Sequence, residues 1–258
     1  MRAFSPSLPP VVVFDLDGTL VDTAPDLVAT LNVVLAAEGL PPLPLHTARD
    51  LIGAGARALI ERGFAASGQA AAPERLDALF QTFMVHYEAN LRVHSRLYEG
   101  VEPCLDRLGA AGFRLAVCTN KFEHQSVALL RAFGIAERFA AICGRDTFRH
   151  FKPDPRHLLA TIEQAGGDPR RAVMVGDSRT DVTTAKAAGI PVIAVPFGYS
   201  DVPIVDLDPD RIVTHFDALD DAVEDLVALG NVGRNGLRPD DLGAVVGATG
   251  IEPVTLRV

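Results

Sequence analysis

Two aspartates, Asp15 and Asp17, follow directly after a short apolar run. The run, Val11 to Phe14, contains three β-branched valines, which is typical of a strand buried in a parallel sheet. Ligands of open α/β sheets bind outside the carboxyl ends of the strands, so both carboxylates stand where chemistry usually occurs. One residue, Leu16, separates the two acids, and Gly18 permits the chain to turn directly after them.

Polar side chains also follow two later predicted strands, and a lysine begins a helix between them. Thr119 and Asn120 follow the strand predicted at 114–118, and Asp177 and Asp181 follow the strand predicted at 172–175. The lysine is Lys152, which precedes Pro153. Because the carboxyl ends of parallel strands meet at one edge of a sheet, we expect these groups to lie beside Asp15 and Asp17.

Such a cluster of carboxylates needs a cation. Four carboxylates close together repel one another. A hard divalent cation relieves this repulsion, and an all-oxygen ligand set suits Mg²⁺, which is the cofactor we expect. The cation and Lys152 would attract an anion. A phosphate group matches best, because its oxygens can bind the metal, Lys152, the Thr119 hydroxyl and backbone N–H groups at the same time.

The two leading aspartates can divide the work of phosphoryl transfer. Asp15 can attack phosphorus and form an aspartyl-phosphate, which splits one hard step into two. Asp17 can protonate the leaving oxygen and then activate the water that hydrolyses the intermediate. Two carboxylates in one field can hold the different protonation states that this division requires.

Four short motifs of this chain resemble, in order, those of the haloacid dehalogenase superfamily. They are Asp15-Leu16-Asp17-Gly18-Thr19, Thr119-Asn120, Lys152-Pro153 and Gly176-Asp177-Ser178-Arg179-Thr180-Asp181. Each motif is weak alone, but four in this order, each at the end of a strand or helix, are highly specific. The resemblance implies an Mg²⁺-dependent phosphohydrolase with a Rossmann-like core.

The resemblance also implies which residues act. Asp15 would be the nucleophile and Asp17 the acid/base, and this second acid argues against the dehalogenase branch, which lacks it. Thr119 and Lys152 would contact the phosphate. The metal would be held by the Asp15 carboxylate, the Asp17 backbone carbonyl and Asp177, with Asp181 in a supporting position.

Further segments resemble the phosphoglycolate phosphatases within the superfamily. They are Asp22-Thr23, Leu51 to Arg57, Tyr98 to Val101, Thr119 to Lys121 and Phe197 to Tyr199. This resemblance implies hydrolysis of 2-phosphoglycolate, a small phosphorylated metabolite, to glycolate and phosphate. Related pyrophosphatases and sugar phosphatases share much of the pattern, so pyrophosphate or a small sugar phosphate is the alternative substrate.

Two residues are candidates for further contacts with the substrate. Gly53 and Gly55 could bend the chain towards the core, and the guanidinium fork of Arg57 suits a carboxylate. The alternative for Arg57 is a surface position on a cap helix. Asn120 either contacts the substrate or caps the helix that follows it.

Two other functions share part of this chemistry. A phosphomutase needs a cap that returns the phosphoryl group to the substrate, and no residue here marks one. A signalling module of the receiver type also pairs a strand-end aspartate with Mg²⁺ and a lysine. Such a module is much shorter, and its chemistry needs neither a helical insertion after the nucleophile nor an acid two residues further on.

The order of predicted elements indicates an α/β fold. Strands alternate with helices from Leu97 onward, which predicts a doubly wound parallel sheet. Between Leu20 and Arg92 we expect helices alone, the first with the Thr23 hydroxyl as its cap and another spanning 47–63. The expected organisation is a catalytic core of residues 10–22 and 97–229, an all-helical cap of 23–96 and a C-terminal extension of 230–258.

Composition excludes several classes of protein. Among 258 residues, 48% are hydrophobic, enough for a sizeable core, and the net charge of −9 argues against nucleic acid as a partner. No apolar run approaches the roughly 18 residues of a membrane span, and Met1 to Pro10 lacks the apolar core of a signal peptide. Three cysteines without CxxC spacing fit a reducing cytoplasm. We expect a monomer or a homodimer that is not bound to membranes.

Overall fold

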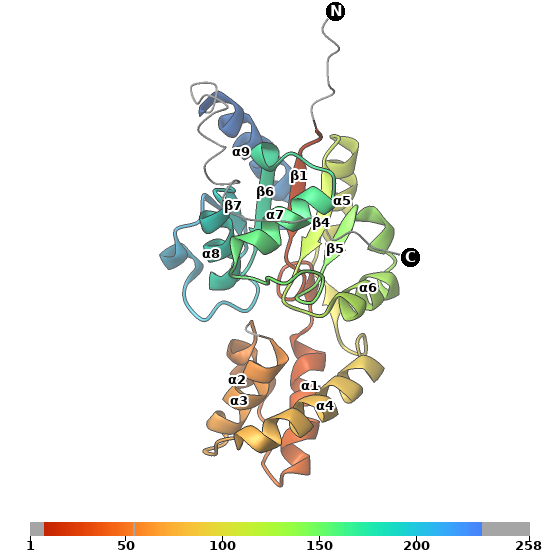
Figure 1. The fold of residues 1–258 in the computed structure, drawn as a ribbon, viewed down its shortest axis with the longest axis vertical. Helices are drawn as coiled ribbons and strands as arrows, with labels where there is room; N and C mark the ends of the chain where they lie inside the picture. Colours follow the sequence, from red (N-terminus) through yellow and green to blue (C-terminus); the bar gives the residue numbers. More distant parts are fainter. Residues whose placement is uncertain (1–7, 54, 234–258) are drawn as a thin grey trace, which may run out of the picture.

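A six-stranded parallel sheet forms the centre of the molecule. The computed structural model describes residues 8–53 and 55–233 (Figure 1). The strands are β1 (Val11–Phe14), β4 (Arg114–Cys118), β5 (Ala141–Cys143), β6 (Ala172–Gly176), β7 (Val192–Ala194) and β8 (Arg211–Ile212). Their order in the sheet is β5-β4-β1-β6-β7-β8, and every neighbouring pair is parallel. The predicted α/β class is confirmed.

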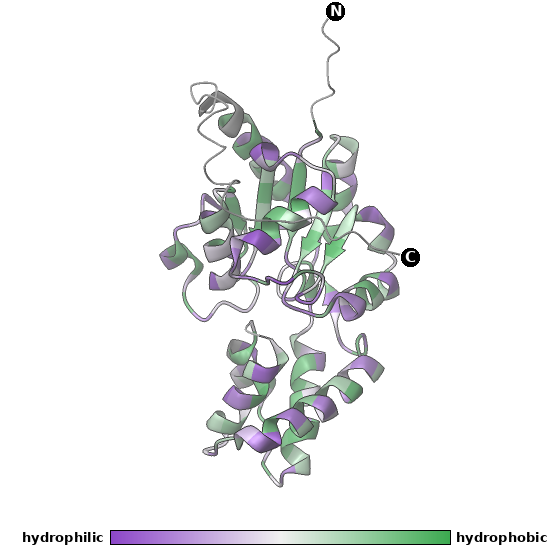
Figure 2. Cartoon of the chain, viewed as in Figure 1, coloured by the Kyte–Doolittle hydropathy of each residue, from purple (hydrophilic) through white to green (hydrophobic). Residues whose placement is uncertain are grey.

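The central strand β1 is buried on both faces, because helices cover both sides of the sheet. Val11 and Val13 pack on one side with α7 (Pro155–Gln164) and α8 (Arg179–Ala188). Val12 and Phe14 pack on the other side with α5 (Val101–Ala110), α6 (Glu123–Ala132) and α9 (Leu219–Gly233). This alternation is why the strand is apolar at every position, as Figure 2 shows by its colour.

Four helices between β1 and β4 form a separate layer with its own core. They are α1 (Ala24–Ala37), α2 (Leu45–Ala48), α3 (Ala56–Ala66) and α4 (Pro73–Ala89). Leu31, Leu35 and Phe83 are fully buried in this cluster. At Gly63 a Cβ atom would come 2.8 Å from a methyl group of Leu31, so α3 lies close enough to α1 that a side chain there would force Leu31 to shift. Figure 1 shows this helical layer beyond the carboxyl end of the sheet.

A short ribbon joins the helical layer to the core, where we had expected no strand. β2 (Val21–Asp22) pairs antiparallel with β3 (Arg96–Leu97). Two residues per strand are too few to produce a readable alternation, so the prediction of helices alone between Leu20 and Arg92 is wrong. The buried carboxylate of Asp26 fixes the same junction, because it accepts hydrogen bonds from the backbone N–H groups of residues 93–95 and from the Ser95 hydroxyl.

The single helix expected at 47–63 is also wrong. The chain forms the short α2, a 3₁₀ turn at Arg49–Leu51 and then α3, with a break between them. Gly53 and Gly55 have φ angles of +115° and +89°, which L-residues rarely adopt, so the helix cannot continue through them.

The last helix, α9, extends to Gly233, beyond residue 229, where we expected the core to end. Most of the predicted extension, residues 234–258, lies outside the described residues. All three cysteines are buried and free. Over residues 8–53 and 55–233, no helix combines the length and the apolar character that crossing a membrane requires.

The buried His157 of α7 should make the stability of the folded protein depend on pH. Its ring is fully buried edge-on to Phe148. Burial, together with the charge of Lys152, lowers the pKa of His157 to about 4 from 6.5. As the pH falls below about 6.5, the unfolded chain therefore binds a proton that the folded chain does not, and stability is lost down to about pH 4. At pH 5 this loss is about 2 kcal/mol.

The variant His157→Gln carries no titratable group at this position. We expect its free energy of unfolding, measured by urea titration at about pH 7.5 and about pH 5, to fall by about 2 kcal/mol less than that of the wild type. Equal losses in the two proteins would show that His157 does not titrate between the folded and unfolded states.

Candidate active site

Three buried carboxylates meet at the carboxyl edge of the sheet. Asp15 follows β1, while Asp177 and Asp181 lie at the end of β6 and in the first turn of α8. One oxygen from each can be chosen so that all three atoms lie within 4.8 Å of one another. The register that pairs β1 with both β4 and β6 brings these distant residues together.

The close approach of these acids shifts their protonation. Burial and the neighbouring Asp181 carboxylate raise the pKa of Asp15 to about 7. The same two causes, with Asp15 as a further charge, raise the pKa of Asp177 well above its ordinary range. The cluster therefore holds more negative charge than its surroundings compensate.

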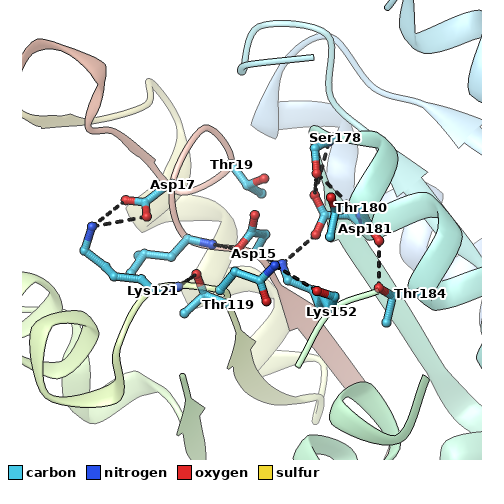
Figure 3. A network of polar contacts seen from close by, with 12 residues as sticks. Asp15, Asp17, Thr19, Thr119, Lys121, Lys152, Ser178, Thr180, Asp181 and Thr184 are labelled. Atoms are coloured by element: carbon cyan, nitrogen blue, oxygen red, sulfur yellow. Dashed lines mark hydrogen bonds and ion pairs between the residues drawn. The ribbon is translucent and has the colours of Figure 1, made fainter. Parts of the chain in front are cut away.

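Lys152 is the cation that lies within this cluster (Figure 3). Its Nζ atom is 2.9 Å from an oxygen of Asp15 and 2.6 Å from an oxygen of Asp181. Burial lowers the pKa of Lys152, but the charges of Asp15 and Asp181 outweigh this effect and raise it, so the ammonium form is kept. One ammonium group against three carboxylates leaves two negative charges unbalanced.

The donor set fits a hard divalent cation. All three side chains offer carboxylate oxygens, and a +2 ion would cancel the remaining charge. Asp181 has further contacts that place it. It forms a capping box with Ser178 at the start of α8 and also binds Lys152, so the position is a helix cap and a partner of the lysine at once.

Asp17 faces away from this cluster and lies on the side of the helical cap. Its carboxylate accepts hydrogen bonds from Lys121 Nζ at 3.0 and 3.1 Å and from the Thr23 hydroxyl at 2.8 Å. Lys121 Nζ also donates to the hydroxyl of Tyr87 on α4 at 2.7 Å. Because Thr23 donates to Asp17, it makes no side-chain cap for α1, and the expectation of a capping hydroxyl is wrong.

The strand-end residues after β4 also reach the site. Thr119 is buried, and its hydroxyl accepts a hydrogen bond from the Lys121 backbone N–H at 3.2 Å. Asn120 donates from its side-chain amide to the Lys152 carbonyl at 2.9 Å, and the N-cap position of α6 is Phe122 rather than Asn120. The buried Oδ1 of Asn120 accepts no hydrogen bond from any residue that the structure describes.

A cleft lies between the core and the cap. It is lined by polar residues of the core, by apolar side chains of the cap and by Arg145 after β5. The polar residues include Asp15, Asp17, Thr119, Asn120, Lys121 and Lys152, and the apolar ones include Leu27, Phe80 and Phe83. Arg57 is not among the residues described as lining it. The guanidinium of Arg57 binds Asp77 at 2.5 Å and stacks over Phe80, and the side chain is 46% exposed.

Several residues of the site had no role in the sequence-based prediction. Lys121 lies within a predicted motif, but a lysine there could equally face solvent. Tyr199 lies within a segment that supported the resemblance but was given no role, although its backbone N–H donates to Asp177 at 2.6 Å and its hydroxyl donates to Asp22 at 2.7 Å. Thr19 donates to the other oxygen of Asp177 at 2.8 Å. These contacts depend on loops that only folding brings together.

Comparison with known proteins decides the family. A family model described as haloacid dehalogenase-like hydrolase matches residues 12–195, which is more than half of the chain and includes all four motifs. The chain belongs to this family. The predicted superfamily is thereby confirmed.

Relatives of this haloacid dehalogenase-like hydrolase point to one branch. A phosphoglycolate phosphatase of Mesorhizobium japonicum is 51% identical over 210 residues, which cover 81% of this chain and 92% of the relative. One of Agrobacterium fabrum is 49% identical over 224 residues, covering 86% and 96%. The predicted class of enzyme, a phosphoric monoester hydrolase, is confirmed by these relatives.

Solved structures agree with this assignment. A structure described as a predicted phosphoglycolate phosphatase from Haemophilus somnus has a TM-score of 0.77 at 32% identity and covers 83% of this chain and 97% of its own. The structure of CbbY from Rhodobacter sphaeroides in complex with phosphate has a TM-score of 0.69 at 27% identity, covering 82% and 96%.

The close packing around Gly18 predicts that a substitution there will disturb the site. Its φ angle is +86°, and a Cβ atom there would lie 2.3 Å from an Asp177 oxygen. Gly39 has a similar φ of +73° but nothing within 4 Å of such an atom. Gly39→Ala should therefore lower the free energy of unfolding only by the cost of placing an L-residue in the left-handed region, about 1 kcal/mol. Gly18→Ala should lose more, because Asp177 must also move.

Urea unfolding and phosphatase assays on both variants test this prediction. We expect Gly18→Ala to lose at least about 2 kcal/mol of stability and roughly 100-fold or more in kcat/KM. Gly39→Ala should keep the wild-type kcat/KM. Similar activity losses in the two variants would contradict the argument from close packing.

Proposed function

We propose that this protein is an Mg²⁺-dependent phosphatase that hydrolyses 2-phosphoglycolate through an aspartyl-phosphate. The observation that carries the proposal is the pairing of Asp15 with Lys152 beside two further buried carboxylates. This is a nucleophile, a phosphate-binding cation and a metal-binding set at one strand edge. The named activity of relatives up to 51% identical supports the choice of substrate.

In the first step of the proposed reaction, Asp15 attacks phosphorus. A carboxylate oxygen of Asp15 forms a bond to phosphorus while the bond from phosphorus to the glycolate oxygen breaks. Asp17 donates a proton to that leaving oxygen, so glycolate departs with a hydroxyl group. Lys152 and the Thr119 hydroxyl bind the phosphoryl oxygens during the transfer.

In the second step, water hydrolyses the aspartyl-phosphate. Asp17, now ionised, accepts a proton from the water as its oxygen attacks phosphorus. The bond between phosphorus and the Asp15 oxygen breaks, which releases inorganic phosphate and restores both aspartates. Lys121 and Thr23 position Asp17 throughout, because both bind its carboxylate.

The proposed metal site consists of Asp15, Asp177 and the Asp17 backbone carbonyl, with Asp181 in support. When bound, Mg²⁺ supplies positive charge that attracts the phosphoryl oxygens and stabilises the transition state. The pKa values of Asp15 and Asp177, both raised by burial and mutual repulsion, support the need for such an ion. The three buried free cysteines support a reducing compartment, the predicted cytoplasm. A monomer or a homodimer stays a prediction.

The substrate assignment is tested by turnover of a panel of phosphate compounds at matched concentration. The panel is 2-phosphoglycolate, pyrophosphate and xylulose 1,5-bisphosphate, the last because a CbbY structure 26% identical to this chain holds it. We expect kcat/KM for 2-phosphoglycolate to exceed the others by 10-fold or more. Asp15→Asn, freed of deamidated protein, should abolish all turnover. A preference for either competitor would reject 2-phosphoglycolate.

The metal is tested by thermal unfolding rather than by activity. An ion that binds only the folded state at 100 times its Kd stabilises it by about 2.7 kcal/mol. We expect Mg²⁺ to raise the Tm of the wild type accordingly. Asp177→Asn should lose most of this rise, because it removes an anionic ligand. Asp208→Asn is the matched control, because it makes the same change at an exposed carboxylate that is paired with Lys186. An undiminished rise in Asp177→Asn would contradict the site.

A further inference from the structure

Three cationic side chains line the cleft, and only one of them is uncommitted. They are Lys121, Arg145 and Lys152. Lys152 is paired with Asp15 and Asp181, and Lys121 is paired with Asp17. Within the described residues, the guanidinium of Arg145 forms no ion pair and no hydrogen bond. A half-buried guanidinium that faces a cleft without an anionic partner can form charge-assisted hydrogen bonds to an anion there.

The backbone holds Arg145 at this position. Its N–H donates to the Lys121 carbonyl at 3.0 Å, which ties the loop after β5 to the loop after β4. The preceding residue is Gly144, where a Cβ atom would lie 2.2 Å from the backbone nitrogen of Glu123. Only glycine allows the two loops to approach this closely. Arg145 is thus fixed beside the residues that follow β4.

The side chain of Arg145 is oriented by aromatic rings. Its guanidinium carbon lies 4.9 Å from the ring centroid of Phe151 and 5.7 Å from that of Phe122. These contacts use the flat faces of the guanidinium and leave its N–H groups, which point outward in the plane, free to donate. A Cβ atom added to Gly55 of the cap would lie 3.4 Å from Arg145 Nη1, so the guanidinium also borders the cap.

We propose that Arg145 binds the second anionic group of the substrate, the carboxylate of 2-phosphoglycolate. This inference rests on the function proposed above and identifies how that substrate is distinguished from other phosphate esters. The phosphoryl group lies at Asp15 and Lys152, and the carboxylate at the other end of the molecule lies at Arg145. The planar guanidinium can bind both carboxylate oxygens at once, which selects for a charged, planar end group.

The position of Arg145 explains why Arg57 is the weaker candidate. Arg57 is already paired with Asp77 and its side chain is 46% exposed, so a carboxylate there would compete with an existing partner and with water. Arg145 has no acidic partner among the described residues and is less exposed than Arg57. The apolar side chains of the cap that line the same cleft, such as Phe80 and Phe83, exclude water and strengthen a charge-assisted hydrogen bond formed there.

Two esters that differ only at the distal group test the proposal. They are 2-phosphoglycolate and 2-hydroxyethyl phosphate, in which a neutral hydroxymethyl group replaces the carboxylate. The measured quantity is the ratio of their kcat/KM values. We expect Arg145→Gln to lower this ratio roughly 10- to 100-fold, mainly through KM for 2-phosphoglycolate, as expected for a lost charge-assisted pair. Arg145→Lys should recover part of the ratio.

Arg149→Gln is the matched control, because Arg149 is an exposed arginine of the same loop that is not among the lining residues. Its ratio should equal that of the wild type. An unchanged ratio in Arg145→Gln, with the wild type still preferring 2-phosphoglycolate, would overturn only the role of Arg145. A loss of the ratio in Arg57→Gln instead would assign the carboxylate to Arg57.

The remaining outcomes separate this proposal from the proposed function. A wild type that shows no preference between the two esters would overturn both. A wild type that prefers xylulose 1,5-bisphosphate, with that preference lost in Arg145→Gln, would reject 2-phosphoglycolate and support an anion-binding Arg145. Equal losses of kcat/KM on both esters in Arg145→Gln would mark a structural role and overturn the proposal.

Discussion

Repulsion among the buried carboxylates of Asp15, Asp177 and Asp181 is the constraint on which the site depends. Three buried acids with oxygens within 4.8 Å of one another would not all stay ionised without positive charge close by. Lys152 provides one charge and contacts two of the three acids. A divalent cation would balance the remaining negative charge. The lysine and the need for a metal therefore both follow from the repulsion within the acidic cluster.

Asp15 and Asp17 lie in different surroundings, and each is held there by its own lysine. Lys152 holds Asp15 at the sheet edge, where burial and neighbouring acids raise its pKa. Lys121 and Thr23 hold Asp17 on the side of the cap, away from the acidic cluster. Two residues of the same kind, two positions apart, thereby receive different partners. This is the physical basis for assigning attack to one and proton transfer to the other.

The cap takes part in the site through shared hydrogen bonds. Lys121 binds Asp17 of the core and Tyr87 of α4 with the same Nζ atom. Tyr199 donates to Asp177 through its backbone and to Asp22, in the ribbon that joins core and cap, through its hydroxyl. Movement of the cap would therefore change the positions of Lys121 and Tyr199, and with them the contacts of Asp17 and Asp177. The cap also contributes the apolar wall against which Arg145 would meet a substrate.

The sequence by itself determined the parallel sheet and the residues at its carboxyl edge. Buried strands of a doubly wound sheet are apolar throughout, so each strand and the polar residues that follow it can be recognised from a short stretch of sequence. It could not reveal the two-residue ribbon of β2 and β3, or the Thr23 hydroxyl that binds Asp17 instead of capping α1. Local patterns do not carry these features, because β2 depends on a partner strand far along the chain and Thr23 depends on how the turn after β1 places Asp17.

Tertiary structure alone decided which cations are free to bind a substrate. Arg57, Lys121 and Arg145 are indistinguishable by type and spacing, since each is a basic residue near a predicted loop. Folding pairs Arg57 with Asp77 and Lys121 with Asp17, and places Arg145 in the cleft, where its guanidinium forms no ion pair with any described residue. The availability of a charge depends on its neighbours in space, and those neighbours lie from 20 to more than 100 residues away along the chain.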